Sequence, residues 1–130
     1  MKGLVLFAHG ARDPAWAAPL VRLRDRIQAA APGTPIEIAF LEMMEPDLTV
    51  AARRLIDAGC ASLAVVPIFL GQGGHVRRDL TALVEQLRSD HPEIRFDVAG
   101  AVGEDASVLD AIAAYCLAML PAREDSHATA

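Results

Sequence analysis

The sequence predicts an α/β fold: a single flavodoxin-like domain with a four-stranded parallel sheet and helices on both faces. Short apolar runs alternate with segments whose apolar residues recur at helical spacing, in the order βαβαβαβα. This alternation is typical of a parallel sheet. The length of 130 residues suits one domain. Because crossovers between parallel strands are right-handed, few topologies remain, and we expect the strand order 2-1-3-4.

Four apolar runs are the expected strands. KGLVLFA (2–8) is short and continuous, as in a strand that is covered on both faces. TPIEIAFLE (34–42), ASLAVVPIFL (61–70) and IRFDVAG (94–100) follow it. Pro67 has no amide hydrogen to donate to a neighbouring strand, so we expect the regular third strand to end near it.

A helix is expected after each strand. Asp13 and Pro14 have the residue types of an N-cap and a first helical position. Pro19 predicts either a kink in this first helix or a later start of its regular part. Pro46 is expected to open the second helix, and Gly59 to end it. The apolar positions at helical spacing are Trp16, Leu20, Leu23 and Ile27, then Leu48, Ala52 and Leu55, then Val76, Leu80, Leu83, Val84 and Leu87, and finally Val108, Ile112, Tyr115 and Met119.

Composition and charge exclude several classes of protein. The formal net charge of −5 argues against general binding of nucleic acid, which favours a basic surface. No apolar run approaches the roughly 20 residues of a membrane-spanning helix, and no targeting segment is visible, so the cytoplasm is the expected compartment. Cys60 and Cys116 are expected to be buried free thiols. The domain is expected to span residues 1–120, with a polar, disordered tail over 121–130.

Three side chains that can bind metal follow neighbouring strands. His9 ends the first apolar run, Glu42 ends the second, and His75 follows the third across the GQGG loop (71–74). With the order 2-1-3, the carboxyl ends of these strands are neighbours, and ligands of such sheets bind there. Two imidazoles and a carboxylate suit Co²⁺, Fe²⁺ or Ni²⁺, and they supply bases near neutral pH. The alternative is that each histidine is a hydrogen-bonded loop residue.

The segment LGQGGH (70–75) also has two interpretations. Glycine amides at a helix N-terminus can hold a phosphate, but the Gly-Lys-Ser/Thr ending of a P-loop and the GxGxxG spacing are absent. We interpret the segment as a loop of close approach. It would let a flat ligand lie near the backbone of Gly73 and Gly74, with His75 at the edge of that ligand.

Three segments together resemble one protein family. They are LFAHGARDPAW, EIAFLEMMEPDL and VVPIFLGQGGHVRRDL, and in this order they cover most of residues 4–80. The chain resembles the short-form CbiX-type chelatases of the sirohydrochlorin group, which insert cobalt, or in relatives iron or nickel, into a partly built tetrapyrrole. The last 50 residues match only as a generic strand and helix.

The resemblance implies roles for the same three side chains. The metal-handling histidines of the family fall on His9 and His75, which would act as metal ligand and proton acceptor, and the acidic position beside them falls on Glu42. Ala11 departs from the family, which usually has serine or threonine there, so a role for that hydroxyl is in doubt. The resemblance also implies a chelatase-like domain without a permanently bound cofactor. A divalent metal (Co²⁺, Fe²⁺ or Ni²⁺) and sirohydrochlorin would be the substrates, in cobalamin or siroheme synthesis.

The tetrapyrrole substrate implies further contacts. Its carboxylates could pair with Arg12, Arg77 and Arg78. Gly73 and Gly74 would contact the substrate through their backbone. The alternative for each arginine is that it is ordinary surface charge. A wide, flat macrocycle needs two walls, so we expect a homodimer. The surface expected between the two copies includes Trp16, Leu20, Met43 and Met44.

Two other functions stay open. The chain could be a non-catalytic carrier of metal or tetrapyrrole. It could also be a phosphohistidine enzyme, because a His-Gly pair with a nearby arginine is found in that class. However, Ala8 precedes His9 where those enzymes normally have an arginine.

Overall fold

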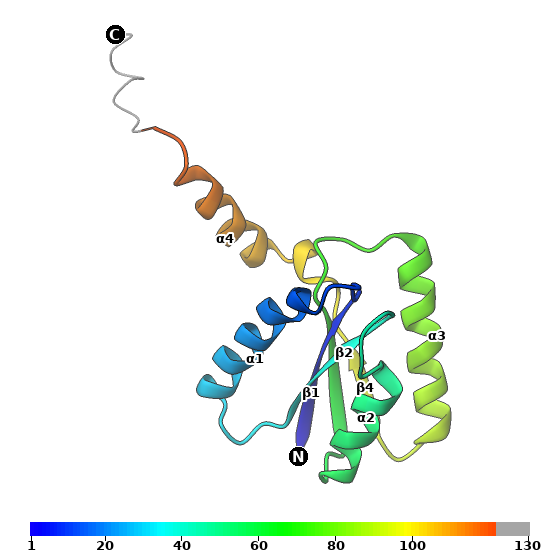
Figure 1. Cartoon of the computed structure of the whole chain (residues 1–130). Coiled ribbons are helices and arrows are strands. Elements are labelled where there is room, and N and C mark those ends of the chain that lie inside the picture. The colour runs from blue at the N-terminus through cyan, green and yellow to red at the C-terminus, as the bar shows by residue number, and fades with distance from the viewer. Residues whose placement is uncertain (122–130) are drawn as a thin grey trace.

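The computed structural model describes residues 1–121 and contains the predicted parallel sheet (Figure 1). Its strands are β1 (Lys2–Ala8), β2 (Ile36–Phe40), β3 (Ser62–Pro67) and β4 (Arg95–Val98). They lie in the order β2-β1-β3-β4 and every pairing is parallel, which confirms the predicted topology. Strand β3 ends at Pro67, as expected of a residue without an amide hydrogen. Apart from residue 121, the predicted tail lies outside the described residues.

Helices follow all four strands. They are α1 (Ala18–Ala30), preceded by the 3-10 helix η1 (Pro14–Ala17), then α2 (Leu48–Asp57), α3 (Gly74–Asp90) and α4 (Ala106–Leu117), preceded by the 3-10 helix η2 (Val102–Glu104). The Asp13 carboxylate accepts a hydrogen bond from the Ala15 amide at 2.9 Å and caps η1. The regular helix therefore starts late, just before Pro19, which is the second of the two expected arrangements.

The expected opening of the second helix at Pro46 is wrong. Asp47 is the N-cap of α2, and its carboxylate accepts a hydrogen bond from the Val50 amide at 2.9 Å. A carboxylate satisfies a free amide of the first turn, which proline cannot do. Pro46 lies before the helix, where its carbonyl accepts a hydrogen bond from the Phe40 amide at 2.9 Å. This bond fastens the loop after β2 to the end of that strand.

Helices cover the sheet on both faces, as predicted. Helices α2 and α3 lie on one face and α1 on the other (Figure 1). Phe7 and Leu63 of the sheet and Leu87 of α3 are buried in the core on the face of α2 and α3. Burying each such side chain stabilises the fold by roughly 1.5–3 kcal/mol. On the other face, Leu6 packs in one cluster with Leu20 of α1.

Helix α4 stands apart from this body (Figure 1). None of its residues is buried, although all of them belong to the described part of the chain. Tyr115, one of its apolar residues at helical spacing, is 78% exposed. Cys60 is buried, as predicted, but the predicted burial of Cys116 is wrong, because the helix that carries it does not pack on the sheet. Within residues 1–121, no helix has both the length and the apolar character needed to cross a membrane.

The loops that follow β1 and β2 are joined through their backbones. The Leu41 amide donates to the Ala8 carbonyl at 2.9 Å, and the Glu42 amide donates to the His9 carbonyl at 3.1 Å. Gly10, at a φ of +97°, lies where these loops pass: a Cβ atom built on it would lie 1.9 Å from the Glu42 carbonyl oxygen. A residue with a side chain therefore cannot occupy this position without moving the loops apart.

Replacing Gly10 with alanine should lower the free energy of unfolding by about 1–3 kcal/mol through backbone strain, with the contact to Glu42 adding to this cost. Gly33→Ala is the matched control, since no atom lies within 4 Å of a Cβ at Gly33 and exposed substitutions usually change stability by less than about 0.5 kcal/mol. Urea denaturation measures both variants. Equal unfolding midpoints for the two would contradict the close approach at Gly10.

Candidate functional site

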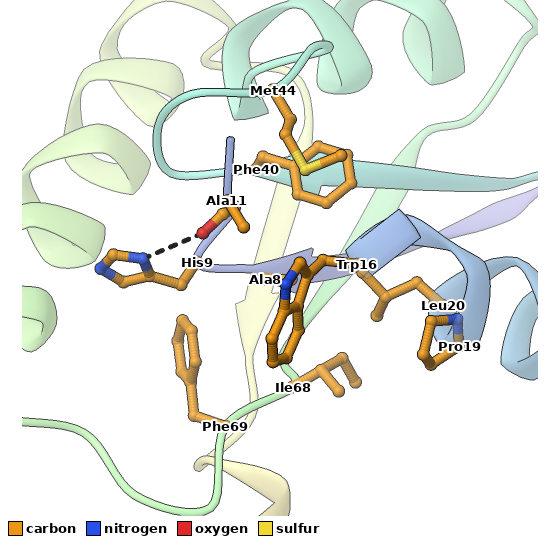
Figure 2. Close-up of a pocket in the computed structure, with 11 residues that line it drawn as sticks. Ala8, His9, Ala11, Trp16, Pro19, Leu20, Phe40, Met44, Ile68 and Phe69 are labelled. Carbon is orange, nitrogen blue, oxygen red and sulfur yellow. Dashed lines mark hydrogen bonds between the residues drawn. The ribbon is translucent and has the colours of Figure 1, made fainter. Parts of the chain in front are cut away.

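A pocket of about 480 Å³ opens at the carboxyl edge of the sheet, on the face covered by α1 (Figure 2). Most of its lining is apolar, with the titratable side chain of His9 at one edge. This volume and this composition are typical of small-molecule sites, which combine apolar walls with a few polar groups. The lining residues are Ala8, His9, Gly10, Ala11, Trp16, Pro19, Leu20, Phe40, Met44, Ile68 and Phe69.

Three aromatic side chains supply flat apolar surface. Trp16 lies in η1 and is 68% exposed, on the surface that we expect between two copies of the chain. Phe69 meets the buried ring of Phe7 edge-on, with ring centroids 6.1 Å apart and an interplanar angle of 87°, a favourable geometry for aromatic pairs. Phe40 lines the pocket from the end of β2. The rings of Trp16, Phe40 and Phe69 could therefore contact a flat ligand.

The sequence analysis did not identify Phe40, Ile68 or Phe69 as site residues. Each lies at or just beyond the carboxyl end of a strand, since Phe40 ends β2 and the other two follow Pro67. That position could have indicated them, because ligands of parallel sheets bind there.

His9 uses one ring nitrogen within its own loop. Its Nδ1 donates to the Gly10 carbonyl oxygen at 3.3 Å, the bond marked in Figure 2. A carbonyl oxygen can only accept, so the hydrogen of the neutral ring is on Nδ1. The lone pair of Nε2 is then available to bind a metal ion or accept a proton.

His75 lies in the first turn of α3 and outside the lining of this pocket. Its side chain is 80% exposed, and its Nε2 lies 3.2 Å from a carboxylate oxygen of Asp79, one helical turn further on. This carboxylate favours a hydrogen on Nε2, which leaves the lone pair on Nδ1. Asp79 is a second residue that the sequence analysis did not assign to the site, although spacing of four residues on a helix indicates such a pair.

The three expected metal ligands are brought together only in part. The backbone of Glu42 is hydrogen-bonded to that of His9, and the Glu42 side chain is exposed. The next residue, Met43, has a φ of +66°, and backbones of this strained kind cluster at functional sites. Across residues 1–121, no three His, Cys, Asp or Glu side chains are grouped so that they could hold a metal ion. The roles of His9, Glu42 and His75 stay predictions.

The expected substrate-binding residues lie in two places. Arg12 is exposed in the loop after β1, beside the pocket residue Ala11. Arg77 lies 3.7 Å from Glu104 and lines a second pocket of about 380 Å³ at the end of β4. Arg78 is exposed on α3. Gly73 is the N-cap of α3, and no atom lies within 4 Å of a Cβ built on it.

Gly74, the first residue of α3, is also accessible. The nearest atom to a Cβ built on it is the Nη1 of Arg78, at 3.4 Å. The space beside both glycines is therefore open, and their contact with a flat ligand stays a prediction.

A backbone hydrogen bond joins the pocket to the start of α4. The Gly103 amide in η2 donates to the Phe69 carbonyl at 2.9 Å. A Cβ on Gly103 would lie 1.9 Å from the Leu70 carbonyl oxygen, so the two segments are in direct contact. The loop after β3 is thereby held against η2.

Two carboxylates outside the pocket have a lowered pKa. The pKa of Asp97 is lowered first by a hydrogen bond from Arg95 and then by one from Lys2. The pKa of Asp105, the N-cap of α4, is lowered first by the Ser107 hydroxyl and then by backbone amides of the first turn. Both groups help to hold surface elements in place and lie apart from the expected chemistry.

Comparison with known proteins assigns the chain to a family. The sequence model of the CbiX family matches residues 3–116. A sirohydrochlorin cobaltochelatase from Methanocaldococcus jannaschii is 33% identical over 91 residues, which are 70% of this chain and 64% of that protein. This chain thus spans slightly less than two thirds of that relative.

Two solved structures share the fold. A cobalamin (vitamin B12) biosynthesis CbiX protein from Marinobacter aquaeolei VT8 superposes with a TM-score of 0.77 and 28% identity, covering 89% of this chain and 94% of that one. The sirohydrochlorin chelatase SirB from Bacillus subtilis subspecies spizizenii, solved in complex with cobalt, has a TM-score of 0.72 and 24% identity, and covers 91% of this chain but 50% of its own. The match over residues 3–116, on the predicted chelatase-like fold, shows that this chain belongs to the CbiX family.

Proposed function

We propose that this chain inserts a divalent metal ion, Co²⁺ or alternatively Fe²⁺ or Ni²⁺, into sirohydrochlorin. The observation that carries the proposal is His9, whose Nε2 is free at the edge of an apolar pocket on the switch point of the sheet. Membership of the CbiX family and the name of the M. jannaschii relative support the substrate and favour cobalt.

The pocket suits the flat part of such a substrate. The macrocycle would lie against the rings of Trp16, Phe40 and Phe69, with an edge toward His9. Its carboxylates would reach the surrounding solvent and the exposed arginines Arg12 and Arg78. Apolar walls exclude water from the ring face, which strengthens the interactions of charges there.

Metal insertion requires two transfers that the histidines can share. Two protons must leave pyrrole nitrogens, and a partly desolvated metal ion must reach the ring centre. One imidazole cannot bind the metal and accept a proton through the same lone pair. His9 offers Nε2 and His75 offers Nδ1, so one can hold the ion while the other accepts the two protons in turn and passes each to solvent, with Glu42 as an additional ligand. An open set of donors suits a metal that is a substrate and must leave.

The site would be completed in a homodimer. The pocket of one chain presents a single wall, while a macrocycle has two faces to cover. Met43 is 58% exposed and Trp16 is 68% exposed beside the pocket, and exposed apolar side chains of this kind mark contact surfaces. Two-fold pairs are the commonest assemblies of identical chains.

Light scattering at micromolar concentration should therefore give a mass of twice the 13.8 kDa of the chain. The measurement is repeated at several concentrations, because dissociation of a dimer depends on dilution. A mass of 13.8 kDa at every concentration, with full activity, would contradict the need for a second wall.

Replacing His9 or His75 with alanine should lower the rate of metal insertion by about 10²-fold each, the usual contribution of a general base. The absorbance change of sirohydrochlorin with Co²⁺, Fe²⁺ or Ni²⁺, compared with the spontaneous reaction, measures the rate. His91→Ala is the matched control, since His91 is at the opposite end of α3 from His75. A wild-type rate equal to the spontaneous rate for all three metals would refute the proposal, and binding without product would favour a carrier.

Replacing Arg12 or Arg78 with alanine should weaken the binding of sirohydrochlorin, and added salt should weaken it as well, because exposed ion pairs are screened. Arg77→Ala should have a smaller effect, since Arg77 already faces Glu104. Arg26→Ala on the exposed surface of α1 is the control. Quenching of Trp16 fluorescence by the bound ring measures the affinity. Unchanged affinity in all variants and at high salt would leave these arginines as ordinary surface charge.

A further inference from the structure

Helix α4 is apolar on all sides yet exposed along its length. Its sequence, ASVLDAIAAYCL, has one charged residue, Asp110. Tyr115 and Leu117 are 78% and 62% exposed, and Met119, just beyond the helix, is 80% exposed. A helix that is apolar all round is normally buried. A contiguous patch of exposed apolar side chains, as on α4, marks a contact with another molecule. The apolar sequence of α4 therefore predicts that another surface covers it, and within the described residues none does.

The sheet of the same chain lacks a cover in one place. Val66 is level with Leu6 in the sheet, so both point to the face that carries α1, and Ala64 points the same way. Leu6 is buried, but Ala64 and Val66 are half-exposed, and Ala99 beyond β4 is exposed. A pocket of about 370 Å³ lies beside Val66 and Ala99 and reaches Val108 of α4. We name the surface of Ala64, Val66 and Ala99 the β3–β4 strip.

We propose that two copies of this chain exchange their α4 helices, each laying its helix over the β3–β4 strip of the other. The inference rests on the homodimer of the proposed function. Each copy has one uncovered strip and one uncovered helix, so a two-fold pair covers both strips and both helices. The match covers 91% of this chain and 50% of SirB, so one SirB chain is almost twice as long as this one.

The exchange also brings the partner helix close to the substrate pocket. Ile68 is the next alternate residue after Ala64 and Val66, and it lines the pocket. The first turn of a helix on the strip therefore lies beside that pocket, where it adds an apolar wall from the second copy. The pocket of one chain is incomplete without this contribution.

A cross-linking experiment on mixed chains distinguishes exchange from other arrangements. In βα units the helix runs antiparallel to its strand. The ten steps of helix from Ala106 to Cys116 cover about 15 Å, which is the length of four to five residues of a strand. This places Cys116 near the start of β3. Ser62 is half-exposed there, level with Arg95 of β4, and Ser62→Cys provides the second thiol.

One chain then carries Ser62→Cys with Cys116→Ala, and the other is the native chain with its exposed Cys116. The two are co-expressed and treated with a short, flexible bismaleimide. We expect a covalent band at twice 13.8 kDa from the mixture and none from either chain alone. The buried Cys60 is present in every sample and serves as an internal control.

A substitution on α4 tests the same contact independently. Tyr115→Glu should reduce the mass by light scattering from twice 13.8 kDa to 13.8 kDa, while Asp110→Asn on the same helix should not. Because Tyr115 contributes nothing to the core, far-ultraviolet circular dichroism should show the variant folded.

Other outcomes separate the exchange from the rest of the proposal. A dimeric mass without the mixed cross-link overturns the exchange and leaves the homodimer and its chemistry intact. A single chain carrying both thiols that links within itself shows that α4 folds back on its own strip, which also overturns the exchange. A monomeric native chain overturns the homodimer and the exchange together, and the rate of metal insertion still tests the proposed function.

Discussion

The site depends on the close passage of two backbones at Gly10. The loops after β1 and β2 are hydrogen-bonded to each other there, and the Glu42 carbonyl occupies the space that a side chain would need. This contact fixes the direction in which the chain leaves β1, and with it the position of the His9 ring. It also brings Phe40 and Met44 from one loop to the same pocket as Ala8 and His9 from the other. A sheet with another strand order would not place these loops side by side.

The two histidines differ in what holds them. His9 is bonded to a neutral carbonyl within its own turn, whereas His75 faces the Asp79 carboxylate across a turn of helix. An anionic partner increases the electron-donating strength of an imidazole toward a metal, and a carbonyl does so less. In the proposed reaction, His75 would therefore be the metal ligand, and His9, next to the pocket, would accept a proton from the bound ring. This division follows from the partners rather than from the histidines themselves.

The fold was largely predictable because its determinants are local. Alternating apolar runs and helical spacing indicate βα units, and Pro67 marks the end of a strand through its own chemistry. The opening of the second helix was not predictable from Pro46 alone, because the neighbouring Asp47 is the better cap. The position of α4 was also missed: its apolar residues indicate that it must be buried, but not against which surface.

The candidate site was predictable to a similar degree. The position of His9 at the carboxyl edge follows from topology, since the end of a strand in a parallel sheet lies at that edge. The lining by Phe69 and the pairing of Asp79 with His75 depend on side-chain directions in three dimensions, which spacing along the chain indicates only weakly. The shared binding of a metal by His9, Glu42 and His75 stays a prediction.

The hydrogen bond from the Gly103 amide to the Phe69 carbonyl links the start of α4 to one wall of the pocket, so that the two segments move together. A ligand that immobilises Phe69 also removes conformational freedom from η2 and from the helix that begins two residues after it. Anything that immobilises α4 lowers, in turn, the entropy that the loop must lose when a ligand binds. Such couplings are reciprocal by thermodynamic necessity. Occupancy of the pocket would therefore favour the immobilisation of α4, and immobilisation of α4 would increase the affinity of the pocket for its ligand, through this one hydrogen bond.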